Sequence, residues 1–409
     1  MRTTCAVAGG GPAGMMLGLL LARAGVEVVV LEKHPDFLRD FRGDTVHAST
    51  IRLLDQLGLG ERFRSMPQSR LQNFELPQLD GTRLTIGDFQ RLRPPYDYVA
   101  MVPQWDLLDL LADAGRSEPT FTLRMSTAAV DLLWEGDRVA GVRTRTAAGV
   151  EDDLHADLVV ACDGRRSVLR AAAGLVPQEC RVPFDTWWFR LPRTESERRE
   201  KASLVPTLSG GEIMLSIPRP DYFQIAYFNR KGLDASLRAE GIERFRERVA
   251  RLRPAFADRL DALTSTDDLH HLDVRMDRLR RWHRPGLLLI GDAAHAMSPA
   301  GGVGINLAIQ DAVAAAALLA EPLAEGRLTE QDLARVQRRR WWPTVLLQQA
   351  QRGLHRLIFT PALGGRTPPA FRVAAAVARR VPALTAVPAR LIAFGPRPEH
   401  APAFARRAG

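Results

Sequence analysis

The residues with the clearest chemical meaning lie in short stretches that are far apart in the chain. Residues 9–14 read GGGPAG, so Gly9, Gly11 and Gly14 match the spacing G-x-G-x-x-G. In that motif the first glycine permits a tight turn, the second lets the backbone approach a pyrophosphate, and the third lets a helix pack on a strand. The chemistry predicted for residues 9–14 is therefore the binding of a dinucleotide.

Two acidic turns, DG at 163–164 and GD at 291–292, each follow an apolar run typical of a buried strand. Open α/β sheets bind ligands at the carboxyl ends of their strands, where Asp292 is able to accept hydrogen bonds from a polyol such as a ribityl chain. Residues 299–304 read PAGGVG and open an alanine-rich helix predicted over 305–320. The N-terminal dipole of that helix would stabilise negative charge on a reduced ring system. These features favour a flavin dinucleotide.

The elements that must position the first motif follow in the order of a dinucleotide-binding βαβ unit. An apolar run at 5–8 predicts a strand, 15–24 predicts a helix that Gly25 ends, and 27–31 predicts the next strand. Glu32 ends this strand where an acid reaches a ribose 2′-hydroxyl, and its charge would repel the 2′-phosphate of NADP. Taken alone, this unit is compatible with both NAD and FAD.

Three motifs carry a resemblance to a known family: G-x-G-x-x-G with Glu32, the DG turn at 163–164, and the GD turn at 291–292 running on to Pro299. In their order and spacing they resemble those of the class A flavoprotein monooxygenases, which share the fold of p-hydroxybenzoate hydroxylase. The resemblance covers residues 1 to about 320. It implies an α/β protein with a Rossmann-type FAD-binding domain, an inserted mixed β-sheet substrate domain and C-terminal helices. It also implies bound FAD, with NAD(P)H and O2 as co-substrates. The expected reaction is hydroxylation of an aromatic or polycyclic small molecule through a flavin C4a-hydroperoxide.

The resemblance assigns cofactor-binding residues to each motif and to two looser matches, Arg42 and Gln104. The expected set is Gly9, Gly11, Ala13, Gly14, Glu32, Lys33, Arg42, Gln104, Asp163, Gly291, Asp292, Gly302, Val303, Gly304, Ile305 and Asn306. Pro299 is expected beside the isoalloxazine, as part of the catalytic surroundings. Two alternatives remain open: Arg42 is an ordinary surface arginine, and Asp163 caps the helix that follows it.

A base that accepts a phenol proton would accelerate the reaction by a factor of about a hundred or more. His47 is the first catalytic candidate because it follows the Arg42 segment, and the alternative is a histidine packed at the start of a helix over 49–57. Weaker candidates are Tyr222, Tyr227 and Asp44. His295, within the GD segment, is expected to pack against the turn.

Strand-like stretches between residues 180 and 233 predict a second sheet that roofs the flavin. Apolar side chains from these stretches are the candidates for lining a substrate chamber, although such residues also simply fill sheet faces. The candidates are Trp187, Met214, Tyr222 and Phe223, together with Phe228.

The predicted domains are discontinuous. Residues 1–72, 98–178 and 275–325 are assigned to the FAD-binding domain, and residues 73–97 and 179–274 to the β-sheet substrate domain. Residues 326–409 are helical in pattern, and we expect them to serve structural packing, with a dimer contact or a membrane-surface contact as alternatives.

Composition excludes several classes of protein. The formal charge is +9, with 56 basic and 47 acidic residues, but no nucleic-acid-binding module is recognisable. An uninterrupted apolar run of membrane-spanning length is absent from the sequence, so no transmembrane segment is predicted. Three cysteines are too few for a disulfide framework, which favours a reducing cytoplasm. No metal site is predicted, and the chain is expected to be a monomer or a homodimer.

Three rival functions share parts of this pattern. A flavin-dependent halogenase would need a W-x-W-x-I-P segment and an active-site lysine, and residues 187–192, WWFRLP, match it only superficially. A prenyl-chain reductase of related fold would not consume oxygen. A non-catalytic FAD-binding module is the third alternative. The substrate, the choice between NADH and NADPH, and hydroxylation against epoxidation or Baeyer–Villiger insertion stay open.

Overall fold

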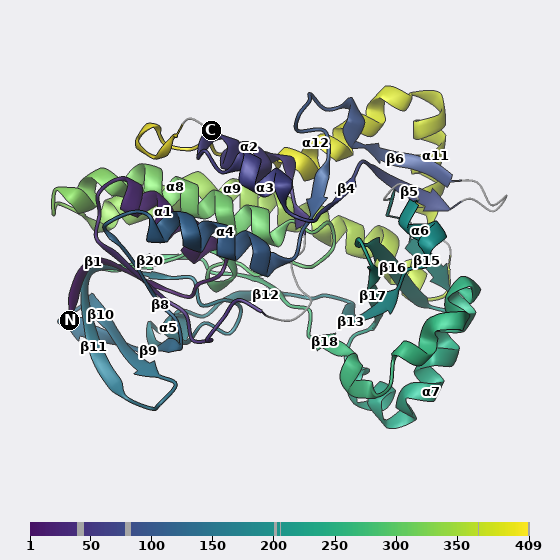
Figure 1. The fold of residues 1–409 in the computed structure, drawn as a ribbon, viewed down its shortest axis with the longest axis horizontal. Helices are drawn as coiled ribbons and strands as arrows, with labels where there is room; N and C mark the ends of the chain where they lie inside the picture. The colour runs from purple at the N-terminus through teal and green to yellow at the C-terminus, as the bar shows by residue number, and fades with distance from the viewer. Residues whose placement is uncertain (39–44, 78–82, 200–202, 205, 367, 408–409) are drawn as a thin grey trace.

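The computed structural model describes residues 1–38, 45–77, 83–199, 203–204, 206–366 and 368–407 (Figure 1). Its largest sheet runs in the order β20-β21-β11-β1-β2-β8, and β21, β11, β1, β2 and β8 are parallel to one another. The strands are β1 (Arg2–Ala8), β2 (Val28–Leu31), β8 (Phe121–Arg124), β11 (Glu151–Ala161), β20 (His283–Arg284) and β21 (Leu287–Leu289). Their apolar runs explain the arrangement, because a parallel sheet is buried on both faces.

Each face of this sheet has its own cover. Four long helices and the short helices α2 and α3 lie on one side, above the sheet in Figure 1, while α5 and the antiparallel hairpin β9–β10 lie on the other. The covering elements are α1 (Pro12–Arg23), α2 (Ala48–Gln56), α3 (Gly60–Ser65), α4 (Gln104–Arg116), α5 (Val168–Ala172), α8 (Gly304–Ala324), α9 (Glu330–Leu354), β9 (Thr127–Glu135) and β10 (Arg138–Thr146). Together they build the three-layered FAD-binding part that the βαβ pattern predicts.

α8 occupies the centre of the helical layer, between α1 and α9. Among the described helices, it alone is long and apolar enough to cross a membrane by length and composition. However, 78% of its most apolar window is buried inside the fold, as in a core helix. Asp311, in the middle of this helix, is completely buried.

The second sheet is antiparallel and runs in the order β15-β16-β17-β13-β18. One face packs against α7 and a 3-10 helix, Pro254–Ala262. The opposite face turns toward β7, α2 and the C-terminal helices. The strands and helix are β13 (Phe184–Pro192), β15 (Pro206–Ser209), β16 (Glu212–Pro218), β17 (Tyr222–Arg230), β18 (His270–Leu272) and α7 (Asp234–Leu252).

Smaller pairings join the two parts of the molecule. β5 pairs with both β6 and β14, so segments from the predicted insertions 73–97 and 179–274 share one sheet. β7 pairs with β3 and β4, and β12 pairs with β19. These strands are β3 (Thr45–Val46), β4 (Ser69–Leu71), β5 (Asn73–Pro77), β6 (Arg83–Asp88), β7 (Val99–Met101), β12 (Gln178–Cys180), β14 (Ser203–Leu204) and β19 (Met276–Arg278). The short helix α6 (Glu195–Arg199) follows β13.

The C-terminal part is helical and returns to the FAD-binding part. α9 continues through a π-helical turn (His355–Phe359) into α10 (Thr360–Leu363), and α11 (Pro369–Arg380) and α12 (Ala386–Phe394) follow. The last segment crosses back to α1, where Arg23 Nη1 donates to the carbonyl of Ala405 at 2.9 Å. The predicted fold class, including the C-terminal helices, is confirmed.

Candidate active site

The fold brings the three motifs to one place. A Cβ atom at Gly9 would lie 2.4 Å from the carbonyl oxygen of Cys162, which directly precedes the DG turn. A Cβ atom at Gly291 would lie 3.4 Å from that of Ala13. Arg165 Nε donates to the carboxylate of Asp292 at 3.0 Å. The G-x-G-x-x-G motif, the DG turn and the GD turn therefore lie next to one another, at the carboxyl ends of β1, β11 and β21.

The glycines of the first motif have separate physical tasks. Gly9 has a φ of +108°, which side-chain-bearing residues rarely adopt, and a Cβ atom at Gly14 would lie 1.9 Å from the carbonyl oxygen of Gly9. By contrast, a Cβ atom at Gly11 would meet no described atom within 4 Å. The backbone at Gly11 is thus open at the start of α1, where a phosphate group approaches helix N–H groups.

Two acidic side chains, Glu32 and Asp163, lie at the same edge of the sheet and hydrogen-bond to backbone N–H groups there. The buried carboxylate of Glu32 accepts hydrogen bonds from the backbone N–H groups of Gly10 at 2.9 Å and His34 at 3.0 Å. Asp163 Oδ2 accepts from the N–H of Leu169 at 3.2 Å, as a helix cap does, and burial raises the pKa of its carboxyl group. Within the described residues, Asp163 Oδ1 is buried without a partner. The open cradle at Gly11 and this unpaired oxygen fit a bound dinucleotide.

The N-terminus of α8 is anchored to the segment before α2. Asn306 Oδ1 accepts from the backbone N–H of His47 at 2.9 Å and from Thr50 Oγ1 at 2.8 Å, and its amide donates to the carbonyl of Thr45 at 3.2 Å. Thr45 Oγ1 donates to the carbonyl of Gly302 at 2.9 Å. The Asn306 side chain therefore holds protein segments together, which leaves its backbone N–H in the first turn of α8 for a ligand.

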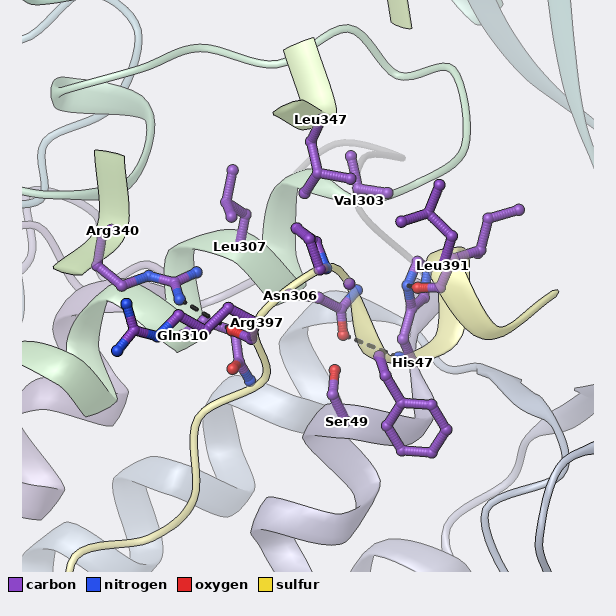
Figure 2. A pocket seen from close by; sticks show the side chains of 14 residues that line it. His47, Ser49, Val303, Asn306, Leu307, Gln310, Arg340, Leu347, Leu391 and Arg397 are labelled. Carbon is purple, nitrogen blue, oxygen red and sulfur yellow. Dashed lines mark hydrogen bonds between the residues drawn. The ribbon is translucent and has the colours of Figure 1, made fainter. Parts of the chain in front are cut away.

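His47 lies at the N-cap of α2 and is almost completely buried. Its ring Nδ1 lies 2.7 Å from the carbonyl oxygen of Ile392 in α12, and burial lowers its pKa to about 4. Figure 2 shows His47 in a recess beside Asn306, between Val303 of the α8 N-terminus and Leu391 of α12. The imidazole is thus neutral at neutral pH, and its role as a base stays a prediction.

Three of the predicted substrate-lining residues, Trp187, Met214 and Phe223, lie inside a packed core cluster. These side chains are buried on the face of the second sheet that packs against α7, away from β7 and α2. Trp187 Nε1 donates to Asp234 at 2.8 Å. Side chains alternate between the two faces of a strand, and both faces of this sheet are apolar, so the pattern did not reveal which face is turned inward.

The remaining aromatic candidates lie on different faces of the second sheet. Tyr227 lies on the α7 side, where its hydroxyl donates to Glu212 at 2.5 Å and burial raises its pKa, so it is not available as a base in the chamber. Phe228 lies on the inward face. Tyr222 lies at the end of β17, with the guanidinium of Arg190 4.8 Å above its ring.

Other predicted residues take simple positions. Lys33 is exposed just beyond β2, and Gln104 is the first residue of α4. Val303 caps α8, whose first residues are Gly304 and Ile305. The backbone carbonyl of Pro299 accepts from the N–H of Gly302 at 3.0 Å, in the loop that leads into α8. Arg42 and Asp44 lie outside the described residues.

Comparison with known proteins decides between the flavin and NAD interpretations. The sequence profile of the family described as FAD binding domain matches residues 2–344. This chain belongs to the class A flavoprotein monooxygenases. It is an FAD-dependent enzyme that uses a reduced nicotinamide and O2 to oxidise a small molecule, as predicted.

Three known proteins illustrate the relationship. The 6-methylpretetramide 4-monooxygenase of Streptomyces rimosus is 37% identical over 403 residues, which cover 96% of this chain and 93% of that relative. The crystal structure of p-nitrophenol 4-monooxygenase PnpA from Pseudomonas putida DLL-E4 matches with a TM-score of 0.78 at 23% identity, over 97% of this chain and 99% of that chain. The myxobacterial chondrochloren halogenase CndH matches with a TM-score of 0.72 at 20% identity, over 97% and 94%. The two solved structures share the fold of this chain. Of the three proteins, the halogenase has the lowest sequence identity to it.

The sequence analysis missed a buried ionic network behind the GD turn. Asp311 accepts from His295 Nε2 at 2.6 Å and from Arg340 Nε at 3.0 Å, and Arg340 also pairs with Glu399 at 3.2 Å. Burial raises the pKa of Asp311, but His295 and Arg340 outweigh this and hold it below its ordinary value. Asp311, a charged residue inside the apolar helix α8, was the available signal, but its partners are distant in sequence.

Acid is expected to destabilise the fold through His47 and His355. Burial lowers the pKa of each from 6.5 to about 4. Between these values the unfolded chain binds a proton that the folded chain does not, so stability is lost as the pH falls from 6.5 toward 4. At about pH 5 the expected loss is about 2 kcal/mol per histidine.

Urea unfolding at neutral pH and at about pH 5 measures this loss. His47→Gln and His355→Gln should each reduce the difference between the two pH values, whereas His155→Gln, at an exposed position, should not. If both variants lose as much stability between neutral pH and about pH 5 as the unchanged protein does, neither imidazole is held neutral by the fold.

Proposed function

We propose that this monooxygenase hydroxylates a polycyclic aromatic substrate with oxygen acceptors, bound against the inward face of the second sheet. The relative from Streptomyces rimosus is named for 6-methylpretetramide, which supports a substrate of that polycyclic class. The inward face packs toward Ala48 of α2 and Met101 of β7. Ala48 directly follows His47, whose backbone N–H is hydrogen-bonded to Asn306 of α8. This position between the sheet and α8 favours it as the substrate surface.

The observation that carries the proposal is a group of buried hydrogen-bonding atoms on this inward face. Thr186 Oγ1, Trp188 Nε1 and Gln224 Nε2 are buried and have no protein partner within the described residues. Trp188 pairs with Ala226 and Arg190 pairs with Gln224 in the β13–β17 register, so Trp188 and Gln224 are diagonal neighbours on one face.

The chemistry of these three groups indicates the kind of ligand. An indole N–H, an amide NH2 and a hydroxyl are donors able to bind phenol, carbonyl or amide oxygens. A buried donor without a partner costs about 1–3 kcal/mol, so a ligand that supplies an acceptor regains that energy. The apolar side chains around them, including Leu215 and Ile217, would contact the rings of the same ligand.

The overall reaction consumes one O2 and one NAD(P)H with a proton, and yields the hydroxylated substrate, NAD(P)+ and water. FAD supplies the reduction of O2 and the transfer of one oxygen atom when it is bound. The contribution of the protein chain is to orient the ring and to exclude water from the reaction. Burial lowers the pKa of His47 to about 4, so its imidazole is a weak base that would accept a hydrogen bond from a phenol rather than its proton.

The two lysines that the structure describes give no support to the halogenase alternative. Of the lysines that the structure describes, Lys33 is exposed beside Glu32, and Lys231 bonds to Asp185 at 2.8 Å and Asp273 at 2.7 Å. We also propose a cytoplasmic location, because Cys5, Cys162 and Cys180 are free thiols. A monomer or homodimer stays a prediction.

Rapid-kinetic measurement of flavin reduction without oxygen tests the function. Polycyclic phenols should accelerate reduction by NADH or NADPH by about tenfold or more, a change of about 1.4 kcal/mol in the barrier. With 18O2, one labelled atom should enter the product. Bound flavin without substrate-stimulated oxidation would favour a non-catalytic module, and a halide-dependent product would favour the halogenase.

A further inference from the structure

One face of α9, continued by the first residue of the π-helical turn, carries a continuous stripe of buried polar side chains. Its members are spaced three or four residues apart, which places them on one side of the helix, and each is 5% exposed or less. They are Arg340, Thr344, Gln348, Gln351 and His355. We call this set the α9 stripe. A helix that only packs against a hydrophobic core presents apolar residues to the interior. The buried polar side chains of the α9 stripe therefore need hydrogen-bond partners.

Those partners lie in the loop between the GD turn and α8. Gln351 Oε1 accepts from the N–H of Ser298 at 3.2 Å, while its Nε2 donates to the carbonyls of Ser298 at 2.8 Å and Ala300 at 2.7 Å. His355 Nε2 lies 2.9 Å from Ser298 Oγ. Gln348 Nε2 donates to the carbonyl of Ala296 at 3.2 Å. Residues on both sides of Pro299 are therefore bonded to α9.

The stripe reaches the GD turn as well. Arg340 bonds to Asp311 Oδ1, while Asp311 Oδ2 accepts from the N–H of Gly291 at 3.2 Å and from His295. Arg340 Nη1 in turn bonds to Glu399 of the C-terminal segment. Bonds from one helix thus reach positions from Gly291 to Ala300, the stretch that contains Asp292 and Pro299.

We propose that the α9 stripe, and Gln351 above all, is a positioning element that sets the segment 291–300 against the isoalloxazine. Gln351 satisfies one N–H and two carbonyl groups of a buried loop, and an apolar side chain would leave all three unpaired. Each unpaired group costs free energy, so the loop would move to regain partners. The π-helical turn at His355–Phe359 brings His355 to Ser298, and such turns are frequent at functional sites. The bonds of Gln351 and His355 reach the flavin side of the site and do not depend on which substrate is bound.

The test compares Gln351→Leu with Gln349→Leu, which makes the same change on the exposed side of the same helix. Apoprotein is titrated with FAD, and the bound flavin is examined by its visible spectrum, its reduction potential and quenching of its fluorescence by iodide. Gln351→Leu should weaken FAD binding by about tenfold or more and shift the spectrum and the potential. Gln349→Leu should match the unchanged protein in all of these measurements.

Two further variants keep the outcome decisive. Gln351→Glu retains the size and one acceptor but loses the donors to Ser298 and Ala300, so it should reproduce the altered spectrum even where the leucine variant fails to fold. His355→Gln should keep a hydrogen-bonding group opposite Ser298 Oγ and resemble the unchanged protein more closely than His355→Leu does. The proposal is overturned if Gln351→Leu or Gln351→Glu lowers the melting temperature of the apoprotein while the affinity, spectrum and potential of FAD stay unchanged. Because no substrate enters these measurements, a failure of the proposed hydroxylation would not affect them.

Discussion

Gly11→Val is expected to abolish FAD binding while the apoprotein stays folded. A Cβ atom at Gly11 meets no described atom within 4 Å, and its backbone is extended, with a φ of −77°, so valine fits the protein itself. The side chain would fill the space through which a pyrophosphate approaches the N-terminus of α1. The Kd for FAD should rise by at least about a hundredfold, measured by titration of apoprotein with FAD.

Gly14→Ala is the informative contrast, because its Cβ atom would lie 1.9 Å from the carbonyl oxygen of Gly9. This variant should unfold at lower temperature with or without FAD, since strand and helix are forced apart. Gly11→Val should instead keep the melting temperature of the apoprotein. A yellow Gly11→Val protein with unchanged affinity would place the pyrophosphate elsewhere.

Trp187→Ala should cost about 3–5 kcal/mol of stability, while leaving substrate recognition intact. Trp187 is fully buried on the α7 side of the sheet and contacts the ring of Tyr227 at 6.0 Å between centroids. Its removal creates a cavity in a packed cluster that contains no part of the proposed substrate surface. Chemical denaturation measures the loss, and the KM of the remaining folded enzyme should be unchanged.

The adjacent tryptophan provides a matched pair. Trp188→Phe and Trp187→Phe both remove one indole N–H, but they lie on opposite faces of β13. Trp188→Phe should raise the KM for a polycyclic substrate by about threefold to tenfold with little effect on stability. Trp187→Phe loses the bond to Asp234 and should affect stability alone. An increase in KM from Trp187→Phe, with none from Trp188→Phe, would reverse the assignment of the faces.

Much of the fold follows from local patterns. The G-x-G-x-x-G turn, the acid at Glu32 and the DG and GD turns each depend on a few neighbouring residues, because tight turns and strand ends have local steric requirements. These patterns predicted the FAD-binding fold and the parallel sheet, the helical pattern of residues 326–409 predicted the C-terminal helices, and the comparisons confirm the family. They also predicted Asp163 and Asp292 at strand ends, where the structure places both.

The tertiary structure decided the features that depend on distant partners. Trp187 and Trp188 are neighbours in the sequence, and α7 determines which of them is covered on the outer side. The contact of His47 with Ile392 and the bonds of Gln351 with Ser298 join residues far apart in the chain. Periodicity specifies which side chains share a face, but the element that covers each face is determined by long-range packing and by the pairing of buried polar groups.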